Sequence, residues 1–334
     1  MGEIRIKTDG PGVYHITSRV IQKRRLLAEE QREVWVSALH RAAGFSGAEV
    51  ITYCALETHF HILVRIDPAA RDCDDATLVQ RYRALYGDAR AQWSGLNADE
   101  LADTLAKGSP EAAEHLRDRL RRRMGDVSEF MRTLRQRYTR WFNRVHGTTG
   151  TLWAERFGSV LVQDTPWLVG LIAAYIDLNA VRAGLADLPE NYRWCGYTEA
   201  LAGSDRLRST LARCFPRAKD VADALAQYRL LMLGKGAAAK GDGTGARIDP
   251  EALLEALKNG GVLQPHELLR LRVRYFSEGR VLGSPDWMDS GEGARVLRRL
   301  PRPPSRKPIQ IVDNVDLAVA RTRSRYRAVE DPRT

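Results

Sequence analysis

The stretch EVITYCALETHFHILVRI, residues 49–66, decides the expected fold. It contains two runs that are rich in β-branched and aromatic residues, 49–56 and 59–66, and only the pair Glu57-Thr58 separates them. Two such runs around a short break predict an antiparallel β-hairpin.

The second of these runs opens with His59, Phe60 and His61. Successive side chains on a strand point to opposite faces, so His59 and His61 are expected on one face and Phe60 in the core. Two imidazoles side by side can grip one divalent ion. A His-x-His pattern alone does not define a metal site, so a second feature is needed.

The segments on either side of the hairpin alternate between strand and helix patterns. A short β-type run covers residues 13–18, and apolar residues at helical spacing cover 26–43, where Gly44 is expected to end the helix. A second helical pattern covers 127–145, and a strand-like stretch follows around 152–162. The sequence therefore predicts an α+β domain.

A further helix is expected over residues 167–179, with Asp164 or Thr165 as its cap and Pro166 in its first turn. Tyr175 and Asn179 lie four residues apart on it, so they share one face. The amide oxygen of Asn179 is a suitable hard ligand beside two histidines. A tyrosine on an apolar helix is usually a core residue, and only the histidines favour a chemical role for Tyr175.

The chain divides into regions of different composition. Residues 1–200 are expected to form the main domain, interrupted at 67–125 by a charged helical insertion that is a candidate DNA-contacting arm. Residues 201–245 read as helices followed by a glycine-rich flexible linker, and 246–334 as a basic helical C-terminal region.

Within the C-terminal region, two helix patterns at 250–258 and 265–275 fit either a DNA-binding helix-turn-helix or a plain helical hairpin. The Pro- and Arg-rich run 301–308 is expected to be extended.

Charge indicates a nucleic-acid partner. The 334 residues carry a net charge of +10, and the basic residues gather in four groups, at 23–25, 117–123, 132–144 and 295–307. Guanidinium groups fit phosphate oxygens in a bidentate way, and separate basic patches are typical of proteins that bind nucleic acid. The alternative for any single group is a solvated helix face paired with glutamates.

The remaining composition favours a reduced, cytoplasmic protein. No apolar run is long enough to cross a bilayer, and the N-terminus has no apolar signal core. Four cysteines, Cys54, Cys73, Cys195 and Cys214, form no Cys-x-x-Cys pair, so neither a disulfide framework nor a zinc knot is expected.

Taken together, the two histidines, Tyr175 and Asn179 imply one chemistry. A divalent ion offsets charge on a scissile DNA phosphate while the tyrosine oxygen attacks phosphorus. A 5′-phosphotyrosine link forms and a 3′-hydroxyl leaves, so a later strand can reverse the step and join.

These residues and their surroundings resemble the IS200-like single-tyrosine transposases of the HUH type, and most closely the branch associated with repetitive extragenic palindromes. The resemblance rests on His59-Phe60-His61, on YTRWFNRVHGTTGTLWAERF at 138–157 and on YIDLNAVRAGL at 175–185. YRWCGY at 192–197 and YHITSR at 14–19 add to it. It covers roughly residues 10–200, apart from the insertion.

The resemblance implies a ferredoxin-like α+β fold with an antiparallel sheet. It implies that His59, His61 and Asn179 hold Mg²⁺ or Mn²⁺ and that Tyr175 is the catalytic nucleophile. The implied substrate is single-stranded DNA beside an imperfect hairpin. Two positions depart from the family pattern, because Glu57-Thr58 stands in place of Pro-Asn and Ala180 in place of Pro. Neither changes the four expected site residues.

DNA contacts are expected from basic residues near these motifs. They are Arg19, Lys23, Arg24, Arg140, Arg144, Arg156 and Arg182. His15 lies on the first strand and is expected to pack or to form a hydrogen bond. Asp177, two residues after Tyr175, is expected to point away from the site.

Two alternatives stay open. A replication-initiator or relaxase-like nickase uses similar parts, although in many relaxases the tyrosine precedes the histidines. A domesticated relative would grip DNA hairpins without cutting them. The sequence leaves open whether the chain is a monomer or a homodimer.

Overall fold

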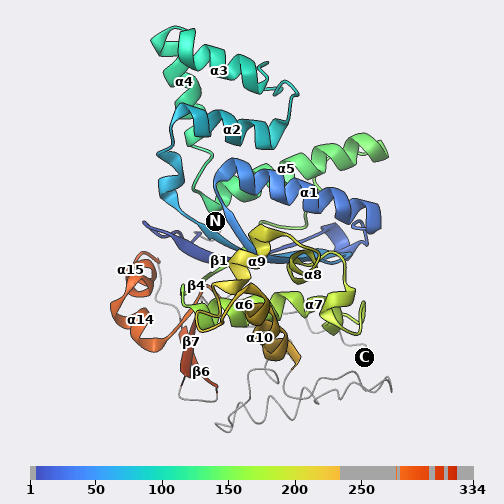
Figure 1. Cartoon of the computed structure of the whole chain (residues 1–334), viewed down its shortest axis with the longest axis vertical. Helices are drawn as coiled ribbons and strands as arrows, with labels where there is room; N and C mark the ends of the chain where they lie inside the picture. Colours follow the sequence, from blue (N-terminus) through green and yellow to red (C-terminus); the bar gives the residue numbers. More distant parts are fainter. Residues whose placement is uncertain (1–4, 234–275, 277–278, 301–304, 312–314, 322–334) are drawn as a thin grey trace.

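The computed structural model describes residues 5–233, 276, 279–300, 305–311 and 315–321 (Figure 1). Its centre is an antiparallel sheet of β1 (Gly12–Arg19), β2 (Glu49–Ala55), β3 (His59–Ile66) and β4 (Gly158–Val162). These strands lie in the order β2-β3-β1-β4. That order, with a helix after β1 and another between β3 and β4, is the ferredoxin-like arrangement, so the expected α+β class is confirmed.

The helices cover both faces of this sheet. On one face α1 (Glu29–Ser46) packs against α5 (Val127–His146), and on the other α6 (Pro166–Asp177) packs on β2 and β3 (Figure 1). The expected alternation on β3 holds, because Phe60 contacts Trp35 of α1 with 4.6 Å between the ring centroids. The side chains of His59 and His61 therefore lie on the α6 side.

One helix end differs from the sequence prediction. Gly44 was expected to end α1, but the helix continues to Ser46 and ends at Gly47, which has a φ of 69°. A left-handed residue of this kind suits glycine, and its amide donates to the Ala43 carbonyl. Gly44 instead lies where a Cβ atom would be 3.2 Å from that of Ala84, so it permits α1 and α2 to approach closely.

The insertion is helical, as expected. It contains η2 (Pro68–Arg71), α2 (Asp75–Tyr86), α3 (Ala98–Lys107) and α4 (Pro110–Arg121). These elements have their own apolar core, which includes Leu78, Tyr82 and Leu101 and receives Phe45 from α1. The insertion extends beyond α1 and α5, away from the sheet (Figure 1). We call residues 67–125 the arm.

The helices after β4 anchor α6 to the sheet. The chain continues through α7 (Asn179–Arg182), η3 (Pro189–Asn191), α8 (Gly196–Leu201), α9 (Asp205–Ala212) and α10 (Val221–Leu233). Residues 192–197 lie beside β2: the Tyr192 hydroxyl donates to the Ala55 carbonyl at 2.6 Å, and the Ala55 amide donates to the Trp194 carbonyl at 2.9 Å.

The expectation of a purely helical C-terminal region is wrong. Its described part contains α14 (Pro285–Ser290) and α15 (Glu292–Arg298), but also the strands β5 (Val281–Gly283), β6 (Ser305–Ile311) and β7 (Val315–Arg321). β5 pairs in parallel with β4, and the β6-β7 hairpin continues the sheet to seven strands. The expected extended run at 301–308 overlaps β6.

The linker at 234–245 and the helix patterns at 250–258 and 265–275 lie outside the described residues. Within the part that the structure describes, every helix is too short or too polar to cross a membrane. All four cysteines are free thiols.

Candidate active site

Four ring side chains from three elements meet on the α6 side of the sheet. His59 and His61 of β3 have ring centroids 5.3 Å apart, and His15 of β1 stacks on His61 at 5.2 Å. Tyr175 of α6 completes the group, with its ring centroid 6.5 Å from that of His61 and 6.1 Å from that of His15. The fold thus brings the predicted nucleophile and the two predicted histidine ligands together.

The strand register explains this grouping. In the antiparallel pairing of β1 and β3, Thr17 lies opposite His61 and His15 lies opposite Leu63. His15 is therefore a diagonal neighbour of His61 on the same face, a distance that ring side chains can bridge. Thr58, in the hairpin turn, adds a contact of 2.9 Å between its hydroxyl and Nδ1 of His59.

The hydrogen bonds of His15 determine which of its ring nitrogens carries a proton. Nδ1 lies 2.5 Å from the carbonyl oxygen of Phe276, and a carbonyl can only accept, so Nδ1 donates. His15 is fully buried, and burial lowers its pKa to about 4. The ring is therefore neutral near pH 7, and its Nε2 holds a lone pair.

The state of His61 follows from that lone pair. Its Nδ1 lies 2.9 Å from Nε2 of His15 and must donate to it. Burial, and then the neighbouring His15 and His59, lower the pKa of His61 well below the usual value, so this ring is neutral as well. The Nε2 atom of His61 is left with the lone pair that a metal ligand needs, and His15 holds the ring in that tautomer.

Asn179 presents its amide in a matching way. Its Nδ2 group donates to the carbonyl oxygens of Tyr175 and Ile176, each at 3.2 Å. Both donors are thus turned towards the end of α6, which leaves Oδ1 as the outward acceptor. Neutral imidazole nitrogen and an amide oxygen suit divalent cations such as Mn²⁺, so these donors fit the expected metal. No group of three or more His, Cys, Asp or Glu side chains suited to a metal is found among the described residues.

Arg182 places positive charge beside Tyr175. Its guanidinium carbon lies 4.1 Å from the centroid of the phenol ring, and Nη2 donates to the Tyr175 carbonyl oxygen. A cation at this position stabilises negative charge that develops on the phenol oxygen or on a phosphate bound next to it. The predicted DNA-binding role of Arg182 is therefore compatible with its place in the site.

Phe276 covers the site. Its ring meets that of Tyr175 edge-on at 5.1 Å, while its carbonyl accepts the hydrogen bond from His15. Tyr175 is only 2% exposed. The phenol can reach a DNA phosphate only after Phe276 has moved away. Sequence reasoning missed this residue, because nothing in the local pattern around position 276 links it to the histidines.

Asp177 points away from the site, as expected, and holds α6 in place. It is fully buried and accepts hydrogen bonds from the hydroxyl of Thr52 at 2.8 Å and from that of Tyr228 at 2.5 Å. Burial raises its pKa to about 7 despite these donors. The carboxyl thus ties α6 to β2 and α10.

The other predicted DNA contacts are spread over two places. Arg19 lies opposite His59 in the strand register and is exposed at the edge of the site, and Arg24 is exposed nearby in the chain. Arg140 and Arg144 lie on α5, and Arg156 follows in the loop before β4; all three are exposed. The side chain of Lys23 lies outside the part of the chain that the structure describes.

Comparison with known proteins gives one structural neighbour to report. No protein-family model matches the chain, and no curated protein sequence matches it significantly. Among solved structures, the REP-associated tyrosine transposase bound to a REP hairpin matches 61% of this chain and 87% of its own, with 14% sequence identity and a TM-score of 0.36. At this level the match is a limited likeness, and the functional argument rests on the residues of the site.

Proposed function

We propose that this chain cuts and rejoins single-stranded DNA beside hairpins, with Tyr175 as the nucleophile and a divalent cation, Mg²⁺ or Mn²⁺, held by His59, His61 and Asn179. The observation that carries the proposal is the hydrogen-bond chain from Phe276 through His15 to His61. It fixes a buried histidine in the tautomer that a metal ligand requires, next to a tyrosine.

The bond changes balance without a nucleotide cofactor. The Tyr175 oxygen forms a bond to the scissile phosphorus, and the bond from that phosphorus to the 3′ oxygen breaks. The phenol proton is lost as the 3′ oxygen gains one, so the products are a 5′-phosphotyrosine and a free 3′-hydroxyl. Attack by another 3′-hydroxyl reverses these changes, which restores Tyr175 and joins the strand.

Each residue has a distinct task in this scheme. The cation, when bound, supplies charge that offsets the build-up on the phosphate oxygens. His15 orients His61, while Arg182 lies against the phenol and favours its negative form. Asp177 keeps α6 in register with β2, so that Tyr175 faces the histidines.

A second candidate function follows from the cover on the site. Because Tyr175 is buried against Phe276, a protein that grips hairpins without cutting them would leave this tyrosine in the same position. The histidine tautomer favours the enzyme, since a binder has no need of a free Nε2 on a buried imidazole.

The test uses labelled single-stranded hairpin DNA taken from the flanks of the chain's own gene, incubated with the protein and Mn²⁺. A covalent protein–DNA adduct is expected with the wild type, and it should be absent without metal and with Tyr175→Phe. Tyr14→Phe is a matched control, because Tyr14 is also a buried tyrosine but lies outside the ring group. DNA binding without any adduct, across metals and flanking sequences, would support the non-catalytic binder.

A further inference from the structure

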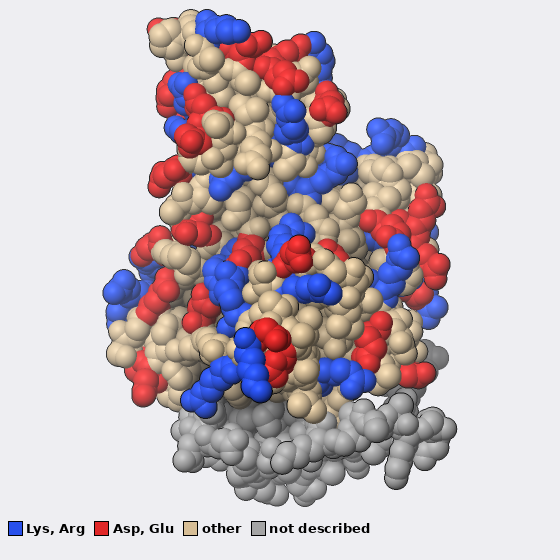
Figure 2. Space-filling model, viewed as in Figure 1, with Lys and Arg blue, Asp and Glu red and all other residues tan. Residues whose placement is uncertain are grey.

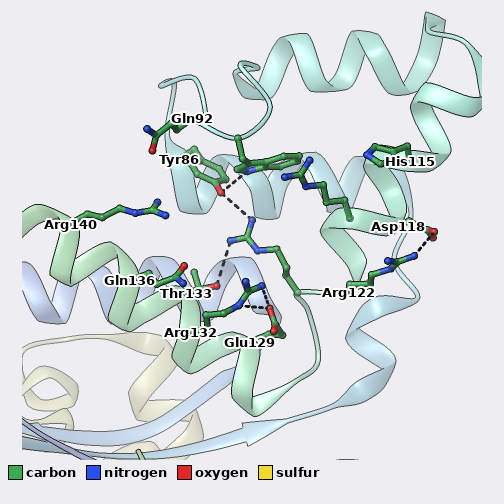
Figure 3. A pocket seen from close by; sticks show the side chains of 13 residues that line it. Tyr86, Gln92, His115, Asp118, Arg122, Glu129, Arg132, Thr133, Gln136 and Arg140 are labelled. Atoms are coloured by element: carbon green, nitrogen blue, oxygen red, sulfur yellow. Dashed lines mark hydrogen bonds and ion pairs between the residues drawn. The ribbon is translucent and has the colours of Figure 1, made fainter. Parts of the chain in front are cut away.

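Two clefts lie side by side along α5. The first, of about 720 Å³, lies between α5 and the arm, and the second, of about 700 Å³, lies between α5 and the loop before β4 (Figure 3). Arg132, Gln136 and Arg140 of α5 line both clefts. We call the two together the arginine groove. The basic groups at 117–123 and 132–144, separate in the sequence, face each other across it.

The charge of the groove is one-sided. Eight arginines and two carboxylates line it, and both carboxylates are already paired, Asp118 with Arg122 and Glu129 with Arg132. Among the described residues no carboxylate pairs with Arg140 or Arg156. On the face seen in Figure 2, by contrast, positive and negative side chains are interspersed.

The arginines of the second cleft repel one another. The pKa of Arg5 is lowered to about 10, first by burial and then by the nearby charges of Arg156 and Arg135. Burial also lowers the pKa of Arg135 to about 10. The nearest opposing charge, Asp126, is engaged with Lys7. Like charges held together in this way indicate that an anion completes the groove.

The aromatic rings of the groove are covered by these arginines. The guanidinium carbon of Arg119 lies 4.4 Å from the ring centroid of Trp93, and those of Arg135 and Arg5 lie 5.3 Å and 3.2 Å from the rings of Trp153 and Phe157. Proteins that hold single strands stack bases on open aromatic faces. A stacked guanidinium still directs its N–H groups outwards in its own plane, so this arrangement favours phosphates over bases.

From these features we infer that the arginine groove binds the phosphate backbone of duplex DNA. The inference rests on the proposed function in one respect, namely that the duplex is the stem of the hairpin whose neighbouring strand Tyr175 attacks. The dimensions agree, since the 20 residues of α5 span about 30 Å, close to the roughly 34 Å of one helical turn of DNA. The arm would then lie along one side of the stem.

The salt dependence of binding tests this inference. The probe is a fluorescein-labelled DNA hairpin with a stem of about one helical turn, compared with an oligonucleotide of the same length that cannot pair. Each lost phosphate contact to duplex DNA lowers the slope of log K against log salt by about 0.9. The double variant Arg140→Gln/Arg156→Gln is expected to lower the hairpin slope by about two, and Arg119→Gln on the arm by about one.

The matched control is Arg217→Gln/Arg298→Gln, which removes two exposed arginines outside the groove and should leave the slope unchanged. Circular dichroism and thermal melting verify that every variant is folded. An unchanged hairpin slope in the folded groove variants would overturn the inference. So would an equal loss of slope on the unpaired oligonucleotide, which would assign the groove to a single strand.

The outcome separates the groove from the proposed chemistry. The Tyr175→Phe variant should bind the hairpin with the wild-type slope. If the groove variants lose slope while the wild type forms no adduct, the groove stands and the catalytic proposal fails. If the adduct forms and the slopes do not change, the catalytic proposal stands and the groove inference fails.

Discussion

His15 and His61, on neighbouring strands, share a hydrogen bond of 2.9 Å between Nε2 of the first ring and Nδ1 of the second. The bond links a residue that is not itself an expected ligand to one that is. It gives His15 a positioning role, with a consequence for metal binding that can be measured without any reaction.

Replacing His15 by Phe keeps a buried ring but removes the acceptor for His61. The affinity for Mn²⁺ is expected to fall about 10- to 100-fold, the usual effect of losing such a supporting hydrogen bond. Isothermal titration calorimetry with Mn²⁺ measures it, and His40→Phe, at a histidine bonded to Glu199, is the control. Unchanged Mn²⁺ affinity in a folded His15→Phe protein would reduce His15 to a packing residue.

Phe276→Ala should uncover Tyr175. The smaller side chain no longer shields the phenol, so the protein–DNA adduct is expected to form faster at equal concentrations of DNA and metal. The same change removes a buried aromatic ring and should lower stability by about 3–5 kcal/mol. Phe276→Leu keeps most of the cover and serves as the comparison. A slower reaction in Phe276→Ala, with the fold intact, would indicate that the ring assists the site.

Asp177→Ala should destabilise the chain strongly, because the hydroxyls of Thr52 and Tyr228 lose their buried acceptor. Each unsatisfied group costs about 1–3 kcal/mol. Asp177→Asn retains an acceptor oxygen and should cost less. Urea unfolding measures both variants, and equal stabilities for the alanine variant and the wild type would show that these bonds contribute little.

Glu199 of α8 should make stability depend on pH. Burial alone would raise its pKa, but hydrogen bonds from His40 and Tyr53 outweigh burial and lower the pKa below the usual value. A carboxylate with a lowered folded pKa contributes stability above its unfolded pKa of about 4.3, and that contribution is lost as the pH falls through the folded value. Glu199→Gln should therefore lose less stability than the wild type on acidification, as chemical unfolding at stepwise lower pH can show.

Local sequence patterns predicted the centre of the fold well. The hairpin at 49–66 and the opposite directions of Phe60 and His61 follow from strand periodicity, which the structure confirms. The end of α1 was misplaced because a glycine can serve close packing as well as termination, and only the tertiary contact between Gly44 and Ala84 distinguishes the two. The strands β5 to β7 were missed because they are short and pair with distant partners.

The site was predictable only where its residues lie close in sequence or share a periodic element. His59 with His61, and Tyr175 with Asn179, are pairs of this kind. The contact of Phe276 with Tyr175 and the facing arginines of α4 and α5 depend on how the chain folds back, which no local pattern encodes.

The parallel pairing of β5 with β4 has a consequence for self-association. Without β5, β4 would be an edge strand of the central sheet, with a row of open backbone donors and acceptors on which another chain can add a strand. The C-terminal strands thus occupy a position that a second molecule would otherwise compete for. A protein shortened before Val281 is expected to gain a sticky edge, and to aggregate or pair with itself edge to edge.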